Sequence, residues 1–327
     1  MNKCKICKRN GECLSINDDG TTLWYACPKV QTVEIPDGIT KIEDYAFIDS
    51  KRLSKIVIPD SVIAIGDSAF SGLKQLCDIT LSNSITRIEN NTFLDCKKIR
   101  KIEIPEKVTY IGFYTFFRCY NIQSITLPKS LTYIGDFALW GTMKSIDIPD
   151  SLTHLGHNAF WGCHNLQEIV LPNSLSDIGD YIFSGCSNLQ NVTLPDNINR
   201  IGSGMFYGCI KMKTILLPDS ITEIDERAFE HCSNLAAITV PDGVKVIQAH
   251  TFSYCKKLLQ VTLPDSIESI KEYAFNDCKS LEHIVYSGTK KQWDSIDKHF
   301  FWREHMKIDV ILHCLDGNYY LYGNNRI

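Results

Sequence analysis

The sequence predicts an α/β-type repeat solenoid, mostly β and irregular, in which short strands stack as parallel rungs. Three observations support this prediction. A unit of 23 residues recurs along the 327-residue chain, each unit ends in the alternating pattern of a half-buried strand, and a proline usually follows that strand. One unit cannot bury enough apolar surface to fold alone, so each copy must gain its stability from its neighbours.

The repeat has eleven copies that share one origin position. The origins are Pro36, Pro59, Ser82, Pro105, Pro128, Pro149, Pro172, Pro195, Pro218, Pro241 and Pro264. Successive origins are 23 residues apart, except that Pro128 and Pro149 are 21 apart, so two residues are missing near Gly141. The third and sixth positions after the origin carry Ile, Leu or Val, and the eleventh carries Phe in every copy but one. We expect these side chains to point inward, with the phenylalanine rings in contact from copy to copy.

The consensus is nearly complete between Leu166 and Cys186, which read LQEIVLPNSLSDIGDYIFSGC. This pattern resembles the BspA-type leucine-rich repeat family, and the resemblance extends over roughly residues 24–313. It implies a right-handed leucine-rich-repeat solenoid of about eleven 23-residue repeats plus caps. It also implies a role in adhesion or protein binding, commonly on the surface of bacteria or of parasitic protists.

Both ends of the chain depart from the repeat, as the caps of a stacked core must. The expected domains are an N-terminal cysteine-containing cap (1–22), the solenoid (23–287) and a C-terminal cap of a helix plus a hairpin (288–327). A hairpin turn is expected at Asp18–Gly20, and Trp24 falls in the phenylalanine position of a partial first copy. In the C-terminal cap, Trp293, Ile296 and Phe300 are predicted to cover the last rung.

Nine of the 14 cysteines occupy one repeat position, fourteen residues after the origin. They are Cys27, Cys96, Cys119, Cys163, Cys186, Cys209, Cys232, Cys255 and Cys278. In-register side chains on rungs ~4.8 Å apart point the same way, so their Cβ atoms do not converge to the ~3.8 Å of a disulfide. We therefore predict a ladder of buried free thiols that fill space as small apolar groups.

Three further cysteines, Cys4, Cys7 and Cys13, lie in the N-terminal cap. Cys4 and Cys7 have the two-residue spacing with which both thiolates of a zinc knuckle reach one ion. A second pair at this spacing is missing, because Cys27 belongs to the repeat column and Cys13 stands alone. Zinc bound by Cys4, Cys7 and Cys13, a disulfide within the cap, and reduced cysteines are therefore all open alternatives.

The charge of the chain argues against nucleic-acid binding. Lys and Arg number 34 and Asp and Glu 38, without the clustered positive charge that phosphate binding requires. No run of 18 apolar residues is present, so we expect no membrane insertion, and the first residues lack the apolar stretch of an export signal. The expected location is the cytoplasm, with the cell surface, reached by unconventional export, as the alternative.

Catalysis is not expected either. No serine lies in a Gly-x-Ser-x-Gly elbow, and the cluster of His154, His157 and His164 has no acid or cysteine placed to complete a catalytic or metal-binding set. We predict that the protein is not an enzyme and that it uses no cofactor apart from the zinc considered for its N-terminal cap.

Two surfaces are candidates for binding a partner. The first is the strand face, which is polar and rich in threonine. We expect a strand in every copy, including residues 145–147 and 214–216. A broad contact with a protein and simple exposure to solvent explain this composition equally well. The second lies five, nine and twelve positions after the origin, where the middle copies carry aromatic residues. These are Tyr110, Tyr114, Phe117, Tyr133, Phe137, Trp140, Trp161, Tyr181 and Tyr207, with His154. In one interpretation, exposed aromatic residues on successive rungs form a patch typical of contact sites. In the competing interpretation, Trp140 and Trp161 fill the space left by the two missing residues.

These observations predict a non-catalytic protein-binding or adhesion scaffold that acts through extended solenoid surfaces, with host or cell-surface proteins among its partners. The alternative is an intracellular structural or regulatory interaction protein with a zinc-binding N-terminal cap. Location and zinc content distinguish the two functions.

Overall fold

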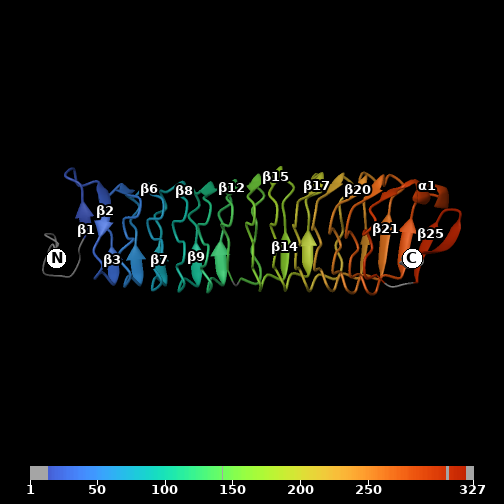
Figure 1. The fold of residues 1–327 in the computed structure, drawn as a ribbon. Coiled ribbons are helices and arrows are strands. Elements are labelled where there is room, and N and C mark those ends of the chain that lie inside the picture. Colours follow the sequence, from blue (N-terminus) through green and yellow to red (C-terminus); the bar gives the residue numbers. More distant parts are fainter. Residues whose placement is uncertain (1–13, 142, 307–308, 322–327) are drawn as a thin grey trace. The chain divides into compact units, whose positions relative to one another are not determined.

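The chain folds into two compact units that are built in the same way. The computed structural model describes residues 14–141, 143–306 and 309–321. Residues up to Phe160 form one unit and residues from Trp161 onward form the other. Each unit is a β-solenoid whose turns follow one another about every 23 residues, with about eleven turns in total (Figure 1). This arrangement confirms the predicted fold class.

The N-terminal unit contains two rows of short strands. The first row comprises β3 (Thr32–Glu34), β5 (Lys55–Val57), β7 (Asp78–Thr80), β9 (Lys101–Glu103) and β11 (Ser124–Thr126). The second comprises β2 (Thr22–Ala26), β4 (Lys41–Ile42), β6 (Ala64–Ile65), β8 (Arg87–Ile88), β10 (Tyr110–Ile111), β12 (Tyr133–Ile134) and β13 (His154–Leu155). Paired residues are 23 apart, as Tyr110 and Tyr133 are, and Tyr133 then pairs with His154. The second row therefore keeps its register despite the two missing residues.

The C-terminal unit repeats this plan. Its first row comprises β14 (Glu168–Val170), β16 (Asn191–Thr193), β19 (Ala237–Thr239), β21 (Gln260–Leu263), β23 (His283–Tyr286) and β25 (Val310–Cys314). Its second row comprises β15 (Asp177–Ile178), β17 (Arg200–Ile201), β18 (Glu223–Ile224), β20 (Val246–Ile247), β22 (Ser269–Ile270) and β24 (Asp297–Lys298). Strands in each row pair in parallel, as in the N-terminal unit.

The prediction of a strand in every copy was wrong at two places. Ser145–Asp147 and Thr214–Leu216 form no strand. The first segment follows the two-residue deletion, which shortens the connection that leads into it. In the second segment the side chain of Leu216 is 87% exposed, and nothing in the structure explains the loss of pairing there.

The core of each unit is a stack of phenylalanine rings, one from each turn. In the N-terminal unit the ring centroids of Phe70 and Phe93 are 5.5 Å apart and those of Phe93 and Phe116 are 5.4 Å apart. In the C-terminal unit Phe229 lies 5.4 Å from Phe206 and 5.6 Å from Phe252. All of these side chains are fully buried, which confirms the predicted spine.

Two positions in each regular turn adopt the left-handed backbone conformation, and the side-chain pattern did not predict them. The position nine residues after the origin has positive φ whatever its side chain, including Tyr45, Ser68, Asn91, Tyr114 and Phe137. The position thirteen residues after the origin does the same in every copy except those of Asp49 and Gly141, and it is glycine in four of the copies with positive φ, Gly72, Gly162, Gly185 and Gly208. Because glycine reaches this conformation without strain, it relieves the cost of the second sharp bend.

In five copies, an aspartate or asparagine eight positions after the origin ties one turn to the next. Asp44 Oδ1 accepts a hydrogen bond from the Asp67 amide at 2.8 Å, and Asp67 Oδ1 accepts one from Asn90 at 3.1 Å. The backbones approach so closely here that a Cβ atom on Gly66 would lie 2.2 Å from Asp44 Oδ1. This close approach explains why glycine commonly precedes the aspartate.

The nine column cysteines are all buried and all free. Their thiols also have a role that was not predicted. Cys96 Sγ donates a hydrogen bond to the carbonyl oxygen of Phe70 at 3.2 Å, and Cys119 Sγ donates one to Phe93 at 3.1 Å. Ser50, which replaces cysteine in this column, donates to the Ala26 carbonyl at 3.1 Å. In these copies the column places a small donor at a buried carbonyl, and a thiol supplies it while remaining largely apolar.

The ends of the chain differ from expectation in the residues that cover the core. The predicted hairpin turn at Asp18–Gly20 is present between β1 (Leu14–Ile16) and β2, which pair antiparallel. Trp24, however, is 55% exposed, and Leu23 and Ala26 are buried in its place. The reason is that Leu23 pairs with Ile42, so the first turn is shorter than a full repeat and its register is displaced.

At the C-terminal end, helix α1 (Lys290–Ser295) begins in a capping box at Thr289, and its Trp293 is buried as predicted, as is Ile296. Phe300 is 70% exposed, contrary to prediction. Trp302 covers the last ring instead, with its ring 5.9 Å from Phe275. Its carbonyl oxygen accepts a hydrogen bond from the Phe275 amide, as the Ala274 carbonyl does from the Phe252 amide in the preceding turn. A hairpin of β25 and β26 (Gly317–Leu321) completes the described chain.

Stability is expected to depend on the phenylalanine spine. Replacement Phe229→Ala removes a ring that two neighbouring rings contact and should lower the free energy of unfolding by ~3–5 kcal/mol in urea denaturation. Leu216→Ala in the preceding segment is the matched control and should change it by less than ~0.5 kcal/mol, because that side chain is solvated. Equal effects of the two substitutions would contradict the stacking account.

The thiol ladder predicts a loss of stability at alkaline pH. Desolvation raises the pKa of Cys96 to about 12 and that of Cys119 well above its usual value of 9.0. The folded thiols therefore stay protonated while those of the unfolded chain ionise, so their stabilisation is complete below about pH 9 and declines as the pH rises toward 12. In this range each thiol lowers the free energy of unfolding by ~1.4 kcal/mol for every unit by which the pH rises.

Urea unfolding between pH 7 and pH 11 measures this dependence. The variant Cys119→Ser keeps a donor, as Ser50 does, but removes one titrating group, so the slope of stability against pH should decrease by ~1.4 kcal/mol per pH unit. An unchanged slope would show that burial does not raise the pKa of Cys119 in the folded protein and would contradict this prediction.

Candidate functional site

The predicted aromatic residues of the N-terminal unit form two groups. The first is the tyrosine stack, which comprises Tyr110, Tyr133 and His154 on the paired strands β10, β12 and β13. In-register pairing aligns these side chains, so the ring centroids of Tyr110 and Tyr133 are 4.6 Å apart and those of Tyr133 and His154 are 4.2 Å apart. The guanidinium of Arg87 in β8 lies 3.7 Å from the centroid of the Tyr110 ring. All three rings are half-buried, so they present edges to solvent.

Arg87 is held in this position by a carboxylate. Its Nε donates to Glu89 Oε1 at 2.8 Å, and this hydrogen bond raises the pKa of Arg87 further above its usual value. The guanidinium is therefore permanently charged and sits on the face of Tyr110, where a cation is attracted by the ring quadrupole.

The second group is the aromatic cluster, which comprises Tyr114, Phe117, Tyr120, Phe137 and Trp140. The rings of Tyr114 and Phe137 are stacked at 4.9 Å, because both residues occupy the left-handed position of adjacent turns. Phe117 meets Trp140 edge to face at 4.5 Å, and Tyr120 meets Trp140 in the same way at 5.7 Å. These contacts make one contiguous apolar surface in which each ring restricts the rotation of the next.

Two exposed aromatic residues of this region were not predicted. Tyr120 is 42% exposed and Phe113 is 44% exposed, and the ring of Phe113 meets Tyr114 edge to face at 6.1 Å. Phe113 stands in a column that supplies a turn-linking aspartate or asparagine in five other copies, and Tyr120 stands in a column that is lysine in each of the three preceding copies. The departure of each residue from its own column was the available signal.

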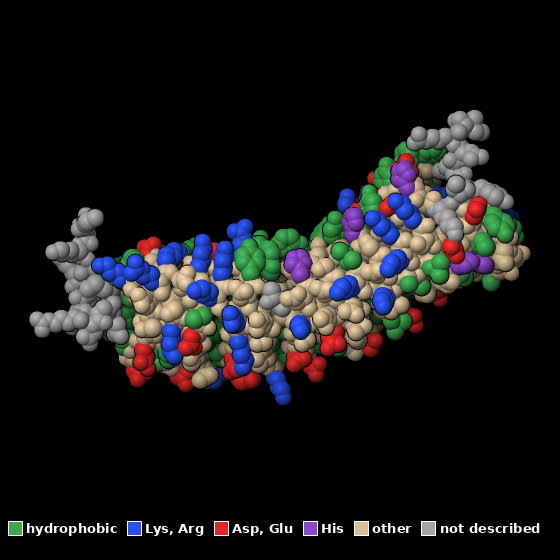
Figure 2. Space-filling view, turned by 90° about the horizontal axis from the view of Figure 1, so that it is seen from below, with side chains coloured by type: hydrophobic (Ala, Val, Ile, Leu, Met, Phe, Trp, Pro, Cys, Tyr) green, Lys and Arg blue, Asp and Glu red, His purple; other side chains and the backbone are tan. Residues whose placement is uncertain are grey.

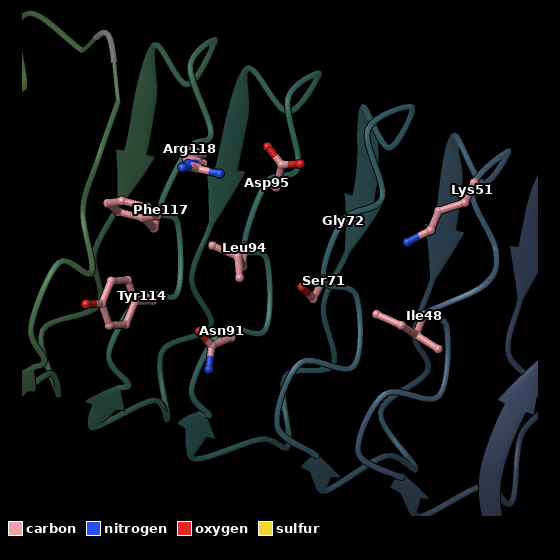
Figure 3. Close-up of a pocket in the computed structure, with 10 residues that line it drawn as sticks. All are labelled: Ile48, Lys51, Ser71, Gly72, Asn91, Leu94, Asp95, Tyr114, Phe117 and Arg118. Carbon is pink, nitrogen blue, oxygen red and sulfur yellow. The ribbon is translucent and has the colours of Figure 1, made fainter.

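A groove lies beside the aromatic cluster in the N-terminal unit (Figure 3). It has a volume of about 530 Å³. Its lining residues are Ile48, Lys51, Ser71, Gly72, Asn91, Leu94, Asp95, Tyr114, Phe117 and Arg118. Small side chains at Ser71 and Gly72 leave space in one turn, and the large rings of Tyr114 and Phe117 form a wall in another.

The remaining predicted residues lie in the C-terminal unit. Trp161 is 36% exposed, and the ring of Tyr181 lies so close to Gly204 that a Cβ there would be 2.1 Å from Tyr181 Cε1. Tyr207 meets His231 at 5.4 Å, and His231 stacks on Tyr254 at 4.5 Å. Tyr207 therefore belongs to a short stack of its own.

Only the described ranges bear on the question of a metal site. Among described residues, no group of three or more His, Cys, Asp or Glu side chains is placed to hold a metal ion. Cys4, Cys7 and Cys13, the candidate zinc ligands, lie outside the residues that the structure describes. Within the same ranges, no helix has the length and apolar character needed to cross a membrane.

Comparison with known proteins identifies related sequences and folds. The chain matches the family described as BspA type leucine rich repeat region, in six copies, over residues 20–143, 111–236 and 222–311. It is similar to the solved structure of a leucine-rich repeat protein from Bacteroides ovatus ATCC 8483, with 27% identity, a TM-score of 0.69 and 90% of each chain covered. A comparison with curated proteins found no match.

Two other solved structures are also similar. One is a leucine rich cell surface protein from Faecalibacterium prausnitzii A2-165, with 26% identity, a TM-score of 0.53, and coverage of 89% of this chain and 97% of that one. The other is the pneumococcal vaccine antigen PcpA, with 16% identity, a TM-score of 0.57, and coverage of 92% and 82%. The second likeness concerns the fold alone.

Proposed function

The chain belongs to the BspA-type leucine-rich repeat family, and we propose that it is a non-catalytic scaffold that binds another protein through the aromatic cluster. Leucine-rich repeats of this kind generally serve protein interaction. The specific assignment to the aromatic cluster rests on one observation, the contiguous and partly exposed surface of Phe113, Tyr114, Phe117, Tyr120 and Trp140.

The frame beneath this surface supports the proposal. The amide of Tyr114 donates to the Asp136 carbonyl oxygen at 2.8 Å, and that of Phe116 donates to Ala138 at 2.9 Å, so adjacent turns are locked together. Rings mounted on such a frame lose little conformational entropy when a partner binds. Tryptophan and tyrosine are also the residues that most often supply the main binding energy of protein interfaces.

The competing interpretation, in which Trp140 fills the space left by the two missing residues, is less well supported. Leu139 and Met143 are fully buried at this turn and fill the core there. Trp140 is only half-buried, and its neighbours Phe117 and Tyr120 are on the outer side of the turn. Its ring therefore extends the surface and is not needed to fill the core.

If the protein is displayed at the cell surface, the proposed protein binding would serve adhesion. The similar protein from F. prausnitzii is described as a leucine rich cell surface protein. We propose instead a reducing compartment, because nine free thiols in one column persist most readily where thiols are kept reduced. Labelling intact cells with a membrane-impermeant lysine reagent, followed by fractionation, tests the location. Labelling of the protein in intact cells would overturn the reducing-compartment proposal and favour adhesion.

Binding through the aromatic cluster predicts a selective effect of two exposed residues, Tyr120 of the cluster and Phe113, whose ring contacts Tyr114. The double variant Phe113→Ser/Tyr120→Ser should weaken binding of the partner recovered from native cells by about 10-fold or more, since each anchor contributes roughly 1 kcal/mol or more. Its melting temperature should stay close to that of the wild type, because both side chains are exposed. Surface plasmon resonance and thermal unfolding give the two readouts.

The matched control is Ile63→Ser, which removes a side chain that is 61% exposed in the same unit. Its affinity should equal that of the wild type. Equal affinities for the control and the double variant would place the interface elsewhere and refute the assignment to the aromatic cluster.

A further inference from the structure

The groove beside the aromatic cluster carries positive charge that its own residues do not neutralise. Lysines occupy the same repeat position in three successive turns, Lys51, Lys74 and Lys97. Asp95 is 3.7 Å from Lys74 and 3.5 Å from Lys97, so one carboxylate serves two lysines. Figure 2 shows Lys and Arg side chains following one another along the N-terminal unit, next to a hydrophobic patch.

Two cations at opposite ends of the groove have no acidic partner. Within the described ranges, no carboxylate lies within 4.0 Å of Lys51 Nζ or of the Arg118 guanidinium. Lys51 Nζ reaches across the floor, since a Cβ on Gly72 would lie 3.1 Å from it. Arg118 lies at the other end, with its guanidinium carbon 5.6 Å from the centroid of the Phe117 ring (Figure 3).

The groove between these cations has both polar and apolar lining residues, with Ser71, Asn91 and Asp95 among the polar ones. Ile48 and Leu94 contribute aliphatic surface, and Tyr114 and Phe117 contribute the aromatic wall. A ligand that fits this arrangement carries negative charge at both ends and an apolar group at its centre.

The spacing of the two cations indicates the length of that ligand. The backbones of Lys51 and Arg118 belong to turns three rungs apart, which corresponds to ~14 Å at ~4.8 Å per rung, and Lys51 Nζ reaches one rung toward Arg118, beside Gly72. An extended peptide advances ~3.3 Å per residue, so carboxylates about three to four residues apart reach both cations.

We propose that the groove binds an extended acidic peptide segment of a partner protein, with carboxylates on Lys51 and Arg118 and an apolar side chain against Leu94, Tyr114 and Phe117. This inference rests on the proposed function and specifies the chemistry of the partner. A peptide fits better than a nucleic acid, because Asp95 lies in the groove and opposes a continuous chain of phosphates, whereas peptide amides can donate to it.

A synthetic peptide tests the proposal directly. The probe is a fluorescein-labelled five-residue peptide with glutamate at both ends, phenylalanine at the centre and serine between, capped at both termini. In fluorescence anisotropy with the full chain, it should saturate below 1 mM and bind more weakly as salt increases. The same peptide with glutamine in place of glutamate should bind about 10-fold more weakly or not at all.

The double variant Lys51→Gln/Arg118→Gln should weaken peptide binding by about 10-fold or more. The matched control, Lys256→Gln/Lys279→Gln, removes two lysines from the same repeat position in the other unit and should leave binding unchanged. Absence of saturation, equal binding of the glutamine peptide, or equal effects of the two double variants would overturn the proposal. A ten-residue oligothymidylate that binds more tightly than the peptide would also overturn it and assign the groove to nucleic acid.

The outcome is separable from that of the proposed function. If Lys51→Gln/Arg118→Gln leaves affinity for the recovered partner intact while Phe113→Ser/Tyr120→Ser abolishes it, the acidic-peptide inference fails and the protein-binding function stands. If the peptide binds as expected but Phe113→Ser/Tyr120→Ser leaves partner affinity unchanged, the acidic-peptide inference is supported and the proposed binding through the aromatic cluster is refuted.

Discussion

Close contact between consecutive turns is the constraint on which the rest of each unit depends. A single turn buries one phenylalanine and a few aliphatic side chains, which is too little apolar surface to hold 23 residues in one conformation. The neighbouring turn supplies what is missing: a second ring for the spine, backbone partners at both strand rows, and an acceptor oxygen such as Asp44 Oδ1 for the next amide. The buried thiols extend the same principle, because cysteines such as Cys96 and Cys119 donate to a carbonyl of the preceding turn.

The regular interior could be predicted from the sequence because its cause is local and periodic. A residue that recurs every 23 positions with the same apolar character must meet its own equivalent, as Phe93 meets Phe116. The same reasoning failed where the neighbouring turn is absent or altered. Trp24 was assigned by counting and Phe300 by its place in the C-terminal cap. The first and last turns lack a further turn that enforces the repeat, so Leu23 and Trp302 are buried instead.

The candidate site was only partly predictable for a related reason. The columns that hold Tyr110, Tyr114 and Phe117 can be counted, and the rings do align. Phe113, Tyr120 and Arg118 escaped notice because their importance comes from which columns adjoin in space. The left-handed backbone at Tyr114 and Arg118 directs these columns, and no side-chain pattern marks it, since tyrosine, serine, asparagine and arginine all occupy such positions.

These features make the N-terminal unit a rigid surface with local differences in chemistry on a repeated backbone. The repeat sets where side chains can stand, and substitutions within individual columns create the aromatic cluster and the adjacent cationic groove. Binding specificity in such a protein therefore changes through surface columns while the spine is kept.

Hydroxyl-radical footprinting of the protein alone and with its bound partner tests this account most directly, because the oxidation rate of a side chain reports its access to solvent. The account predicts that oxidation of Phe113 and Tyr120 falls on binding while that of Leu216 and Leu259 is unchanged, and protection of the strand face with no change at Phe113 and Tyr120 would contradict it.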